Sequence, residues 1–332
     1  MKKTILSFTV LMILCCFGLT VHAKDGFPIN IAVEFTDHAA SAYIAKEKGW
    51  FEQEGIKPTF YNYITGMSLA AALGRGEIQA AYICLMPAIN AYANARIPIR
   101  VVTGLHKYGY GLAVNPAKIK TVKDLEKSDI RIGAVQAGGP VDATLLKTIE
   151  KYGLDRNKVL SRVQRMNPPQ QIMAIRMGKL DASFVPEHWP VMAENAGFRM
   201  LLTSQDVWPD MQGSVLIVKE ELIKNNPEIV GKLVVLTNKA TNWINKNPEN
   251  AAIIAAKHLQ AAGEKIFPVE AAKTAANLSF SASDIQRSMK RLEYTVNVDS
   301  RAVQESIDFA VRQGYIPKSF IAGDILDLRF SR

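Results

Sequence analysis

Residues 36–56 read T-D-H-A-A-S-A-Y-I-A-K-E-K-G-W-F-E-Q-E-G-I, and this stretch decides the fold expected for the chain. The apolar residues of positions 29–35 alternate before it, as they do in a β-strand. Asp37 is a favoured N-cap residue, and the helix formers of residues 39–48 predict a helix that Gly49 ends. A strand, a loop and a helix in this order leave free backbone N–H groups at the helix start. Such a place suits the polar or anionic end of a small molecule.

Strand, polar loop and helix then recur in the same order along the chain. Apolar and β-branched stretches predict strands at residues 59–64, 81–85, 99–104, 110–114, 131–135, 183–185 and 213–219, and from Val163. Helices are predicted at residues 69–73, 88–95, 141–152 and 170–177, followed by amphipathic helices from Asn226 onward. Strands that alternate with helices predict an α/β fold with largely parallel sheets.

Two motifs carry a resemblance to a known family. Residues 45–51, A-K-E-K-G-W-F, with G-I at positions 55–56, and residues 74–80, G-R-G-E-I-Q-A, resemble the periplasmic solute-binding proteins of ABC importers. The importers in question carry nitrate, alkanesulfonates, taurine and thiamine-pyrimidine precursors, and the resemblance covers nearly the whole mature chain. It implies a two-lobe α/β periplasmic binding protein of type II, with a central mixed, largely parallel sheet in each lobe.

The resemblance also implies how the chain divides into lobes. Lobe 1 is expected to be discontinuous, with residues 24–112 and 213–332, and lobe 2 to hold residues 113–212. Two crossing strands would connect the lobes and act as a hinge. Ligand contacts from both lobes would favour the closed state.

Residues 1–23 have the three parts of an export signal. Two lysines begin the segment, residues 5–19 are apolar, and V-H-A at positions 21–23 is a small-residue cleavage site. The apolar run is shorter than the roughly 20 residues that a spanning helix needs. The sequence therefore predicts a periplasmic protein cleaved after position 23, with a lipid anchor at Cys15 or Cys16 as the alternative.

Composition and motif content exclude several classes of protein. The formal net charge of +9 is compatible with a solvated basic surface or with a weak field that attracts anions. Arginine clusters are lacking, so we expect no nucleic-acid partner. Cleavage leaves Cys84 as the one remaining cysteine, so no intrachain disulfide is expected. The sequence has no phosphate loop, nucleophile elbow or thiol pair, so we expect a protein that is not an enzyme and uses no cofactor.

The histidines do not have the spacing of a metal site. His38, His106 and His188 could approach one another in the fold, but no HxxxH or HExxH pattern is present. Histidines without such spacing usually act as separate hydrogen-bonding groups. We therefore expect no metal ligands in this chain.

Polar loops at the strand ends of lobe 1 are the first candidates for the ligand site. Capping of a helix is the alternative role for the polar members from Thr36 to His38 and for Thr65 and Ser68, and packing is the alternative for the apolar members. The lobe 1 candidates are Thr36, Asp37, His38, Thr65, Gly66, Met67, Ser68, Leu85 and Met86.

Two turns of lobe 2 supply the remaining candidates. Gln136, Gly138 and Gly139 resemble a small-residue turn that faces the anion in sulfonate-binding relatives, and glycines allow close approach of a ligand to the backbone. In the second turn Trp189 would stack on the ligand, while Glu187 or His188 would form a hydrogen bond with it. Packing at the strand end is the alternative role for these three side chains.

The resemblance implies a monomeric solute-binding protein that delivers a small molecule to an ABC permease and its ATPase. A small anion of the alkanesulfonate, taurine or nitrate type is the first ligand class, and a neutral heterocycle such as a thiamine-pyrimidine precursor is the alternative. A pyrimidine synthase shares the fold, but it is cytosolic and carries a cysteine-rich stretch that this chain lacks.

Overall fold

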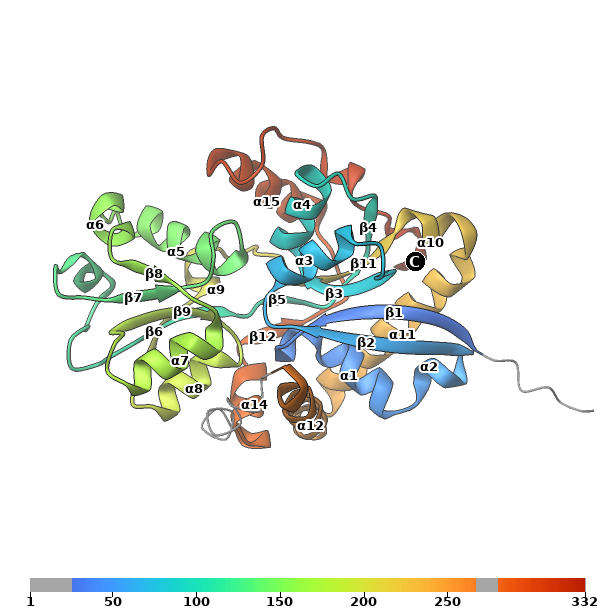
Figure 1. The fold of residues 1–332 in the computed structure, drawn as a ribbon, viewed down its shortest axis with the longest axis horizontal. Helices are drawn as coiled ribbons and strands as arrows, with labels where there is room; N and C mark the ends of the chain where they lie inside the picture. The colour runs from blue at the N-terminus through green and yellow to red at the C-terminus, as the bar shows by residue number, and fades with distance from the viewer. Residues whose placement is uncertain (1–25, 267–279, 332) are drawn as a thin grey trace, which may run out of the picture.

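The computed structural model describes residues 26–266 and 280–331. The predicted export signal, its cleavage site and both of its cysteines lie outside the described residues. Two five-stranded sheets, each covered by helices, form the two halves of the molecule (Figure 1). A two-stranded ribbon lies between them and connects elements distant in sequence.

The first sheet has the order β2-β1-β3-β11-β4. Its strands are β1 (Phe27–Glu34), β2 (Ile56–Tyr63), β3 (Ala80–Cys84), β4 (Ile99–Gly104) and β11 (Ser214–Lys219). β1 runs parallel to β2 and β3, whereas β11 is antiparallel to β3 and β4. The carboxyl ends of β1, β2 and β3 therefore meet at one edge, where the polar loops of the first half begin.

The second sheet has the order β10-β6-β9-β7-β8. Its strands are β6 (Tyr110–Val114), β7 (Ile132–Ala134), β8 (Val163–Arg165), β9 (Ala182–Pro186) and β10 (Arg199–Thr203). β7 is parallel to β8 and β9, while β6 is antiparallel to β9 and β10. Both sheets are therefore mixed.

The chain changes sheet between β4 and β6 and again between β10 and β11. Near the first change β5 (His106–Tyr108) pairs with β12 (Leu292–Tyr294). β5 and β12 were not expected from the sequence, because each has only three residues with a charged one in the middle. β10 was not expected either. The lobe limits at residues 112 and 213 stay a prediction.

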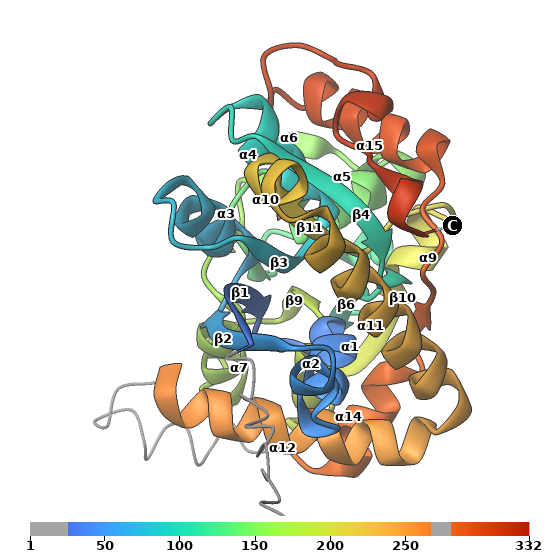
Figure 2. The same cartoon turned by 90° about the vertical axis from the view of Figure 1, so that its right-hand side faces the viewer.

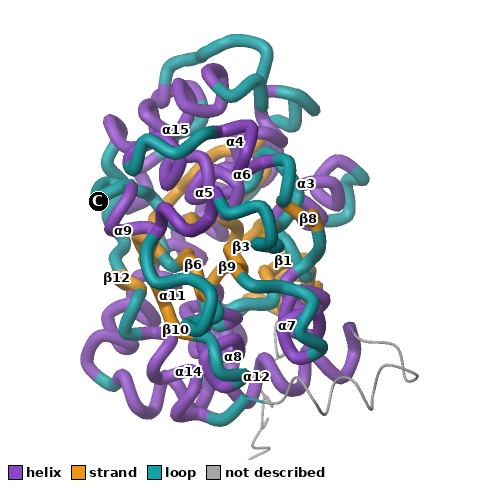
Figure 3. The backbone as a smooth tube through the Cα atoms, turned by 90° about the vertical axis from the view of Figure 1, so that its left-hand side faces the viewer, coloured by secondary structure: helices purple, strands orange, loops and turns teal. Residues whose placement is uncertain are grey.

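Helices cover both faces of each sheet. In the first half they are α1 (Ala40–Glu47), α2 (Trp50–Gln53), α3 (Gly66–Gly74) and α4 (Leu85–Ala93). In the second half they are α5 (Pro140–Lys151), α6 (Arg156–Leu160), α7 (Pro168–Arg176), α8 (Trp189–Asn195) and α9 (Ser204–Val207). Figure 3 shows α5 on one side of the second sheet, with α7 and α8 on the other.

The last part of the chain returns to the first half and then reaches the second. It forms α10 (Glu220–Asn225), α11 (Pro227–Lys246), α12 (Pro248–Ile266), α14 (Ala282–Met289) and α15 (Ser300–Arg312). Figure 2 shows α12 and α14 together at one end of the molecule and α15 at the other. None of the helices in the described ranges is both long and apolar enough to span a bilayer.

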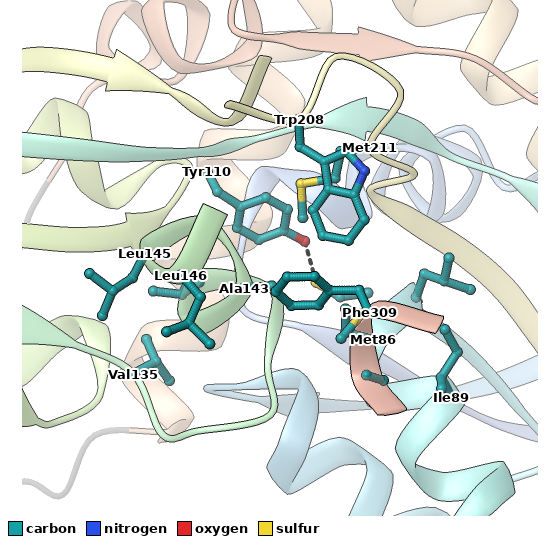
Figure 4. Packing of buried hydrophobic residues seen from close by; sticks show 14 of the residues in the cluster. Met86, Ile89, Tyr110, Val135, Ala143, Leu145, Leu146, Trp208, Met211 and Phe309 are labelled. Atoms are coloured by element: carbon teal, nitrogen blue, oxygen red, sulfur yellow. Dashed lines mark hydrogen bonds between the residues drawn. The ribbon is translucent and has the colours of Figure 1, made fainter. Parts of the chain in front are cut away.

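The apolar core extends across the contact between the halves. Met86 and Ile89 of α4 belong to the same cluster as Leu145 of α5 and Phe309 of α15 (Figure 4). Trp208, which follows α9, packs against Phe309 with ring centroids 5.1 Å apart. The structure therefore shows the two halves in contact at this end.

The opening stretch folds largely as predicted, with two corrections. Gly49 follows α1 with φ 63°, as expected of a glycine after a helix C-cap. The predicted N-cap at Asp37 is wrong, since Asp37 lies inside a 3-10 turn and α1 begins after Ala39 without a side-chain cap. The second correction concerns residues 50–53, where the sequence predicted no helix and the structure forms the short helix α2.

Candidate functional site

A small, partly open cavity lies where loops of both halves meet. Its volume is about 40 Å³. One water needs roughly 10–15 Å³ on this scale, and sites for drug-sized ligands measure about 300–1,000 Å³. The lining residues are Glu34, Thr36, Ile64, Thr65, Gly66, Met67, Cys84, Pro87, Tyr110, Val135, Gly139, Pro140, Val141, Pro168 and Pro186. We call this cavity the interlobe pocket.

The first wall of the interlobe pocket is the start of α3. Thr65 caps this helix, because its side chain accepts a hydrogen bond from the Ser68 backbone N–H at 3.2 Å. Gly66 lies against the carboxyl group of Glu34, where an added Cβ would be 2.0 Å from Oε1. A side chain at position 66 is therefore incompatible with the present place of Glu34.

The opposite wall is the start of α5. Gly139 is the N-cap residue and offers no side chain, and Pro140 occupies the first turn. Gly138 has φ 87°, a conformation that favours glycine, and its carbonyl accepts a hydrogen bond from Asn90 Nδ2 of α4 at 3.0 Å. This bond ties the turn of the second half to a helix of the first.

One buried polar cluster borders the interlobe pocket. Cys84 Sγ donates a hydrogen bond to Glu34 Oε2 at 2.7 Å, and the Tyr110 hydroxyl donates to the same sulfur at 2.8 Å. His38 Nδ1 lies 3.9 Å from Cys84 Sγ, and His38 Nε2 donates to the carbonyl of Gly109 at 2.9 Å. We call Glu34, His38, Cys84 and Tyr110 the thiol cluster.

Burial sets the protonation of the thiol cluster. It raises the pKa of Glu34 to about 7 against the opposing hydrogen bonds from Cys84. Burial also raises the pKa of Cys84, whose thiolate would face the Glu34 carboxylate. Burial and the neighbouring His106 lower the pKa of His38, so its ring is neutral at pH 7. The cluster therefore presents a neutral thiol, a neutral imidazole and a carboxyl group that titrates near neutrality.

A second buried polar cluster starts from the residue just before His38. The hydroxyl of Ser288, on α14, lies within hydrogen-bond distance of Asp37 Oδ2 and of Glu187 Oε2, the latter at 3.1 Å. Arg291 Nη1 is 3.5 Å from Glu187 Oε1. We call Asp37, Glu187, Ser288 and Arg291 the carboxyl cluster.

The carboxyl cluster has more carboxyl groups than one hydroxyl can satisfy. Ser288 has one hydrogen to donate and two carboxyl neighbours, so a protonated carboxyl group must supply the other hydrogen bond. Burial raises the pKa of Asp37 to about 7 and that of Glu187 to about 8, although Arg291 opposes both shifts. The hydrogen-bond geometry and the raised pKa values both indicate that at least one of these two carboxyl groups is protonated.

Five of the residues predicted for the ligand site line the interlobe pocket. They are Thr36, Thr65, Gly66, Met67 and Gly139. Two others lie behind the wall, with Ser68 in the cap of α3 and Gly138 in the turn before α5. The exposed Gln136 and the buried Leu85 and Met86 of α4 are not among the lining residues.

The other predicted residues lie in buried clusters beside the pocket. His38 belongs to the thiol cluster, and Asp37 and Glu187 belong to the carboxyl cluster. The ring of His188 stacks on that of Trp189 with centroids 4.8 Å apart, and both side chains are buried. Neither His188 ring nitrogen has a hydrogen-bond partner among the described residues.

Sequence reasoning missed the polar residues that organise both clusters. Glu34 carried the clearest signal of them in the sequence, because a carboxylate that ends an otherwise apolar strand indicates a partner or a ligand. Cys84 was read as a plain strand residue, and Tyr110 as a strand start. Ser288 and Arg291 carried no local signal, since they lie more than 200 residues from Asp37.

Comparisons with known proteins give the family and the fold. The model of the NMT1-like family matches residues 25–259. A Brucella abortus (strain 2308) protein named as a binding protein is 25% identical over 266 residues, which are 76% of this chain and 78% of the relative.

Two solved structures share the architecture. The ligand-binding component of an ABC-type import system from Staphylococcus aureus, solved with zinc bound, has a TM-score of 0.76 at 16% identity and covers 92% of this chain and 97% of its own. The alkanesulfonate-binding protein SsuA from Xanthomonas axonopodis pv. citri, bound to MOPS, has a TM-score of 0.73 at 16% identity and covers 92% and 99%. The predicted α/β periplasmic-binding-protein fold is confirmed.

Proposed function

Because the chain belongs to the NMT1-like family, we propose that it is the solute-binding component of an ABC importer. The observation that carries the proposal is the interlobe pocket, which is lined from both halves and lies between the starts of α3 and α5. Binding there would hold the halves together around the solute. The protein would act in the periplasm after removal of residues 1–23, as a monomer, and deliver its solute to a permease with an ATPase.

The charge of the interlobe pocket favours a solute that donates hydrogen bonds. No lysine or arginine is among the described lining residues, whereas Glu34 contributes a carboxyl group. The remaining walls are mostly apolar side chains and prolines. A small neutral heterocycle with amino or ring N–H groups, such as a pyrimidine precursor, therefore suits the pocket best. Because the pocket volume is only about 40 Å³, the two halves would have to move apart from their present contact for such a solute to enter.

A small anion is the second candidate. The backbone at the starts of α3 and α5 faces the pocket, and helix starts attract negative charge. The similar SsuA structure, which holds MOPS, also supports an alkanesulfonate, and taurine and nitrate belong to the same class. Protonation of Glu34 would be needed for such a ligand, because a carboxylate beside it would repel it.

Glu34→Gln separates the two ligand classes. For a neutral donor-bearing solute, loss of the carboxylate should weaken binding by about tenfold, or about 1.4 kcal/mol. For an anion the same change should strengthen binding, because the repelling charge is gone. The exposed Glu77→Gln is the matched control and should leave affinity unchanged.

The measurement is calorimetric titration of chelator-treated protein with an aminopyrimidine, an alkanesulfonate, taurine and nitrate. Native mass spectrometry of protein purified from the periplasm would identify a co-purified solute. X-ray scattering should show a smaller radius of gyration on saturation. The proposal is overturned if no solute binds, or if binding persists in a variant with a bulky side chain at Gly139.

Cys84 and Glu34 pair in the wall of the interlobe pocket, but burial raises the pKa of the Cys84 thiol, so it stays protonated and is a poor nucleophile. We propose binding without catalysis. The pyrimidine synthase reading predicts that the protein itself is consumed. Mass analysis after incubation with candidate solutes should therefore find an unchanged chain mass.

A further inference from the structure

Three side chains that can bind a metal ion converge at the edge of the first sheet. They are Glu34 at the end of β1, His38 in the following turn and Cys84 at the end of β3. One ligand atom from each lies within 4.8 Å of the others, and all three residues are buried. Chain folding alone has collected a carboxylate, an imidazole and a thiol at one point.

The hydrogen bonds orient His38 for coordination. Its Nε2 donates to the carbonyl of Gly109, which leaves the lone pair of Nδ1 directed to the side of Cys84, 3.9 Å away. Metal-binding histidines commonly donate their other ring N–H to a carbonyl or carboxylate in this way. Gly109 is required for this contact, because an added Cβ would be 2.6 Å from His38 Nε2.

Charge and ligand type restrict the choice of ion. A divalent ion with one thiolate and one carboxylate gives a neutral group, so its burial does not leave an unpaired charge. The thiol proton, and the carboxyl proton where present, would pass to solvent when the ion binds. Thiolate and imidazole together favour Zn²⁺ over Mg²⁺ or Ca²⁺, which prefer oxygen ligands.

The distances need only small side-chain movements. Zn–S and Zn–N bonds of about 2.3 and 2.0 Å place tetrahedral ligand atoms about 3.5 Å apart. The observed Cys84 Sγ to His38 Nδ1 distance of 3.9 Å is close to that, while the hydrogen-bonded contact of 2.7 Å between Cys84 Sγ and Glu34 Oε2 must widen. The fourth position faces the interlobe pocket, since Glu34, Cys84 and Tyr110 all line it.

We propose that Glu34, His38 and Cys84 form a Zn²⁺ site with one open position toward the interlobe pocket. The site goes beyond solute binding, because its three protein ligands are in place without any solute. A bound ion would offer the solute a Lewis-acid contact at its open position. The proposal departs from the sequence expectation of no metal ligands, because the members of the site are spread over 51 residues from Glu34 to Cys84.

Cobalt substitution tests the site through the thiolate itself. The mature full-length chain is stripped with a chelator and titrated with Co²⁺ alone. One Co²⁺ per chain should bind, with the near-ultraviolet thiolate-to-cobalt charge-transfer band and the strong visible bands of a tetrahedral ion. Zn²⁺ should abolish both by displacement.

Variants assign the ligands. Cys84→Ser should remove the charge-transfer band, and His38→Gln should weaken Co²⁺ binding by at least about tenfold. His258→Gln is the matched control, because that ring bonds Glu47 at 2.9 Å and does not belong to the group of three ligand residues, and it should leave the titration unchanged. Circular dichroism and melting temperatures show whether each variant is folded.

The proposal is overturned if the folded wild-type protein gives no charge-transfer band, or if the band survives Cys84→Ser. Should Cys84→Ser not fold, X-ray absorption of the wild-type zinc complex decides instead, since one sulfur neighbour is expected and none would contradict the site. Solute titrations are made on the chelator-treated protein. A negative result for the metal site therefore leaves the test of solute binding unaffected.

Discussion

Asp37 and His38 are consecutive residues, yet their side chains enter two different buried polar clusters. His38 turns to Cys84 and Glu34 of the first sheet, where Tyr110 of the second sheet closes the thiol cluster. Asp37 turns to Ser288, which also contacts Glu187 at the end of the second sheet. Glu34, Cys84 and Tyr110 of the thiol cluster line the interlobe pocket, whereas no member of the carboxyl cluster is among its lining residues.

The difference between the clusters lies in charge and in what they connect. The thiol cluster has one carboxyl group and no cation, so it is suited to bind a hydrogen-bond donor or a metal ion. The carboxyl cluster includes Arg291 and joins the first turn, α14 and the strand end that carries Glu187. We propose that it holds these elements together rather than receiving a ligand. The predictions below test this division.

Removal of Arg291 should have the largest effect on stability. The guanidinium lies 3.5 Å from Glu187 Oε1 and 2.7 Å from Glu194 Oε1. Arg291→Ala removes both hydrogen bonds to the Glu194 carboxyl group and the cation beside Glu187, and we expect a loss of about 3 kcal/mol in the free energy of unfolding. Urea denaturation at pH 7 measures it.

Arg287→Ala is the control for Arg291→Ala. Arg287 pairs with Asp284 and Glu194 but is about half exposed, and exposed pairs contribute below about 1 kcal/mol. Equal losses in the two variants would contradict the assignment of a structural role to the carboxyl cluster.

Gly66→Ala should come next, because it acts on the thiol cluster through Glu34. The new Cβ would be 2.0 Å from Glu34 Oε1 and 2.7 Å from Pro87 Cγ. Overpacking of this kind costs about 1–3 kcal/mol and should also displace the carboxyl group from the interlobe pocket. Thermal unfolding and solute titration both report on it.

Gly74→Ala provides the matched comparison in the same helix. Its nearest neighbour would be 3.6 Å away, so the methyl group fits and the helix should gain about 0.5–1 kcal/mol. If both alanines change stability and binding alike, the contact between Gly66 and Glu34 is not what matters.

The pH dependence of stability should report on the carboxyl cluster. The pKa of Glu187 is raised from 4.5 to about 8 by burial, with Asp37, Glu194 and Arg291 as its charged neighbours. Between these two values the native state holds a proton that the unfolded state has released, so stability should fall as pH rises from about 4.5 to about 8.

Glu187→Gln should flatten that pH profile. The amide stays neutral at every pH, so part of the fall, on the order of 1–2 kcal/mol, should disappear. Unfolding curves from pH 5 to pH 8 for both proteins provide the test. A wild-type stability that rises over this range would mean that Glu187 is ionised beside Arg291.

Tyr110→Phe should have the smallest effect on stability and a selective effect on binding. It removes the hydroxyl that donates to Cys84 Sγ at 2.8 Å, for a cost of about 1 kcal/mol. Tyr82→Phe removes a bond of the same length to Thr237 and should cost a similar amount. Only the change at Tyr110 should alter affinity for the solute, because Tyr110 lines the interlobe pocket and Tyr82 does not.

The order of strands and helices followed from local sequence signals. Alternating apolar residues marked β1, helix formers marked α1, and Gly49 marked the helix end. The polar loops at Thr65 and Gly139 were also found, because each stands between a strand and a helix. Periodicity and capping act over a few residues, so they remain readable in the sequence.

Short strands and the partners of buried side chains could not be predicted from local sequence signals. β5 and β12 have three residues each, and they pair although they lie far apart in the chain. Asp37 looked like a helix cap, yet its partner is Ser288, 251 residues further on. A side chain that has both a local and a distant option follows the distant one when packing brings it close.

The sequence by itself therefore determined the type of fold and the places where loops could receive a ligand. Only the tertiary structure decided that Glu34, His38 and Cys84 meet, and that Asp37 and His38 serve different clusters. The physical reason is that propensity and periodicity act between near neighbours, whereas buried polar groups must find partners wherever the packed chain supplies them.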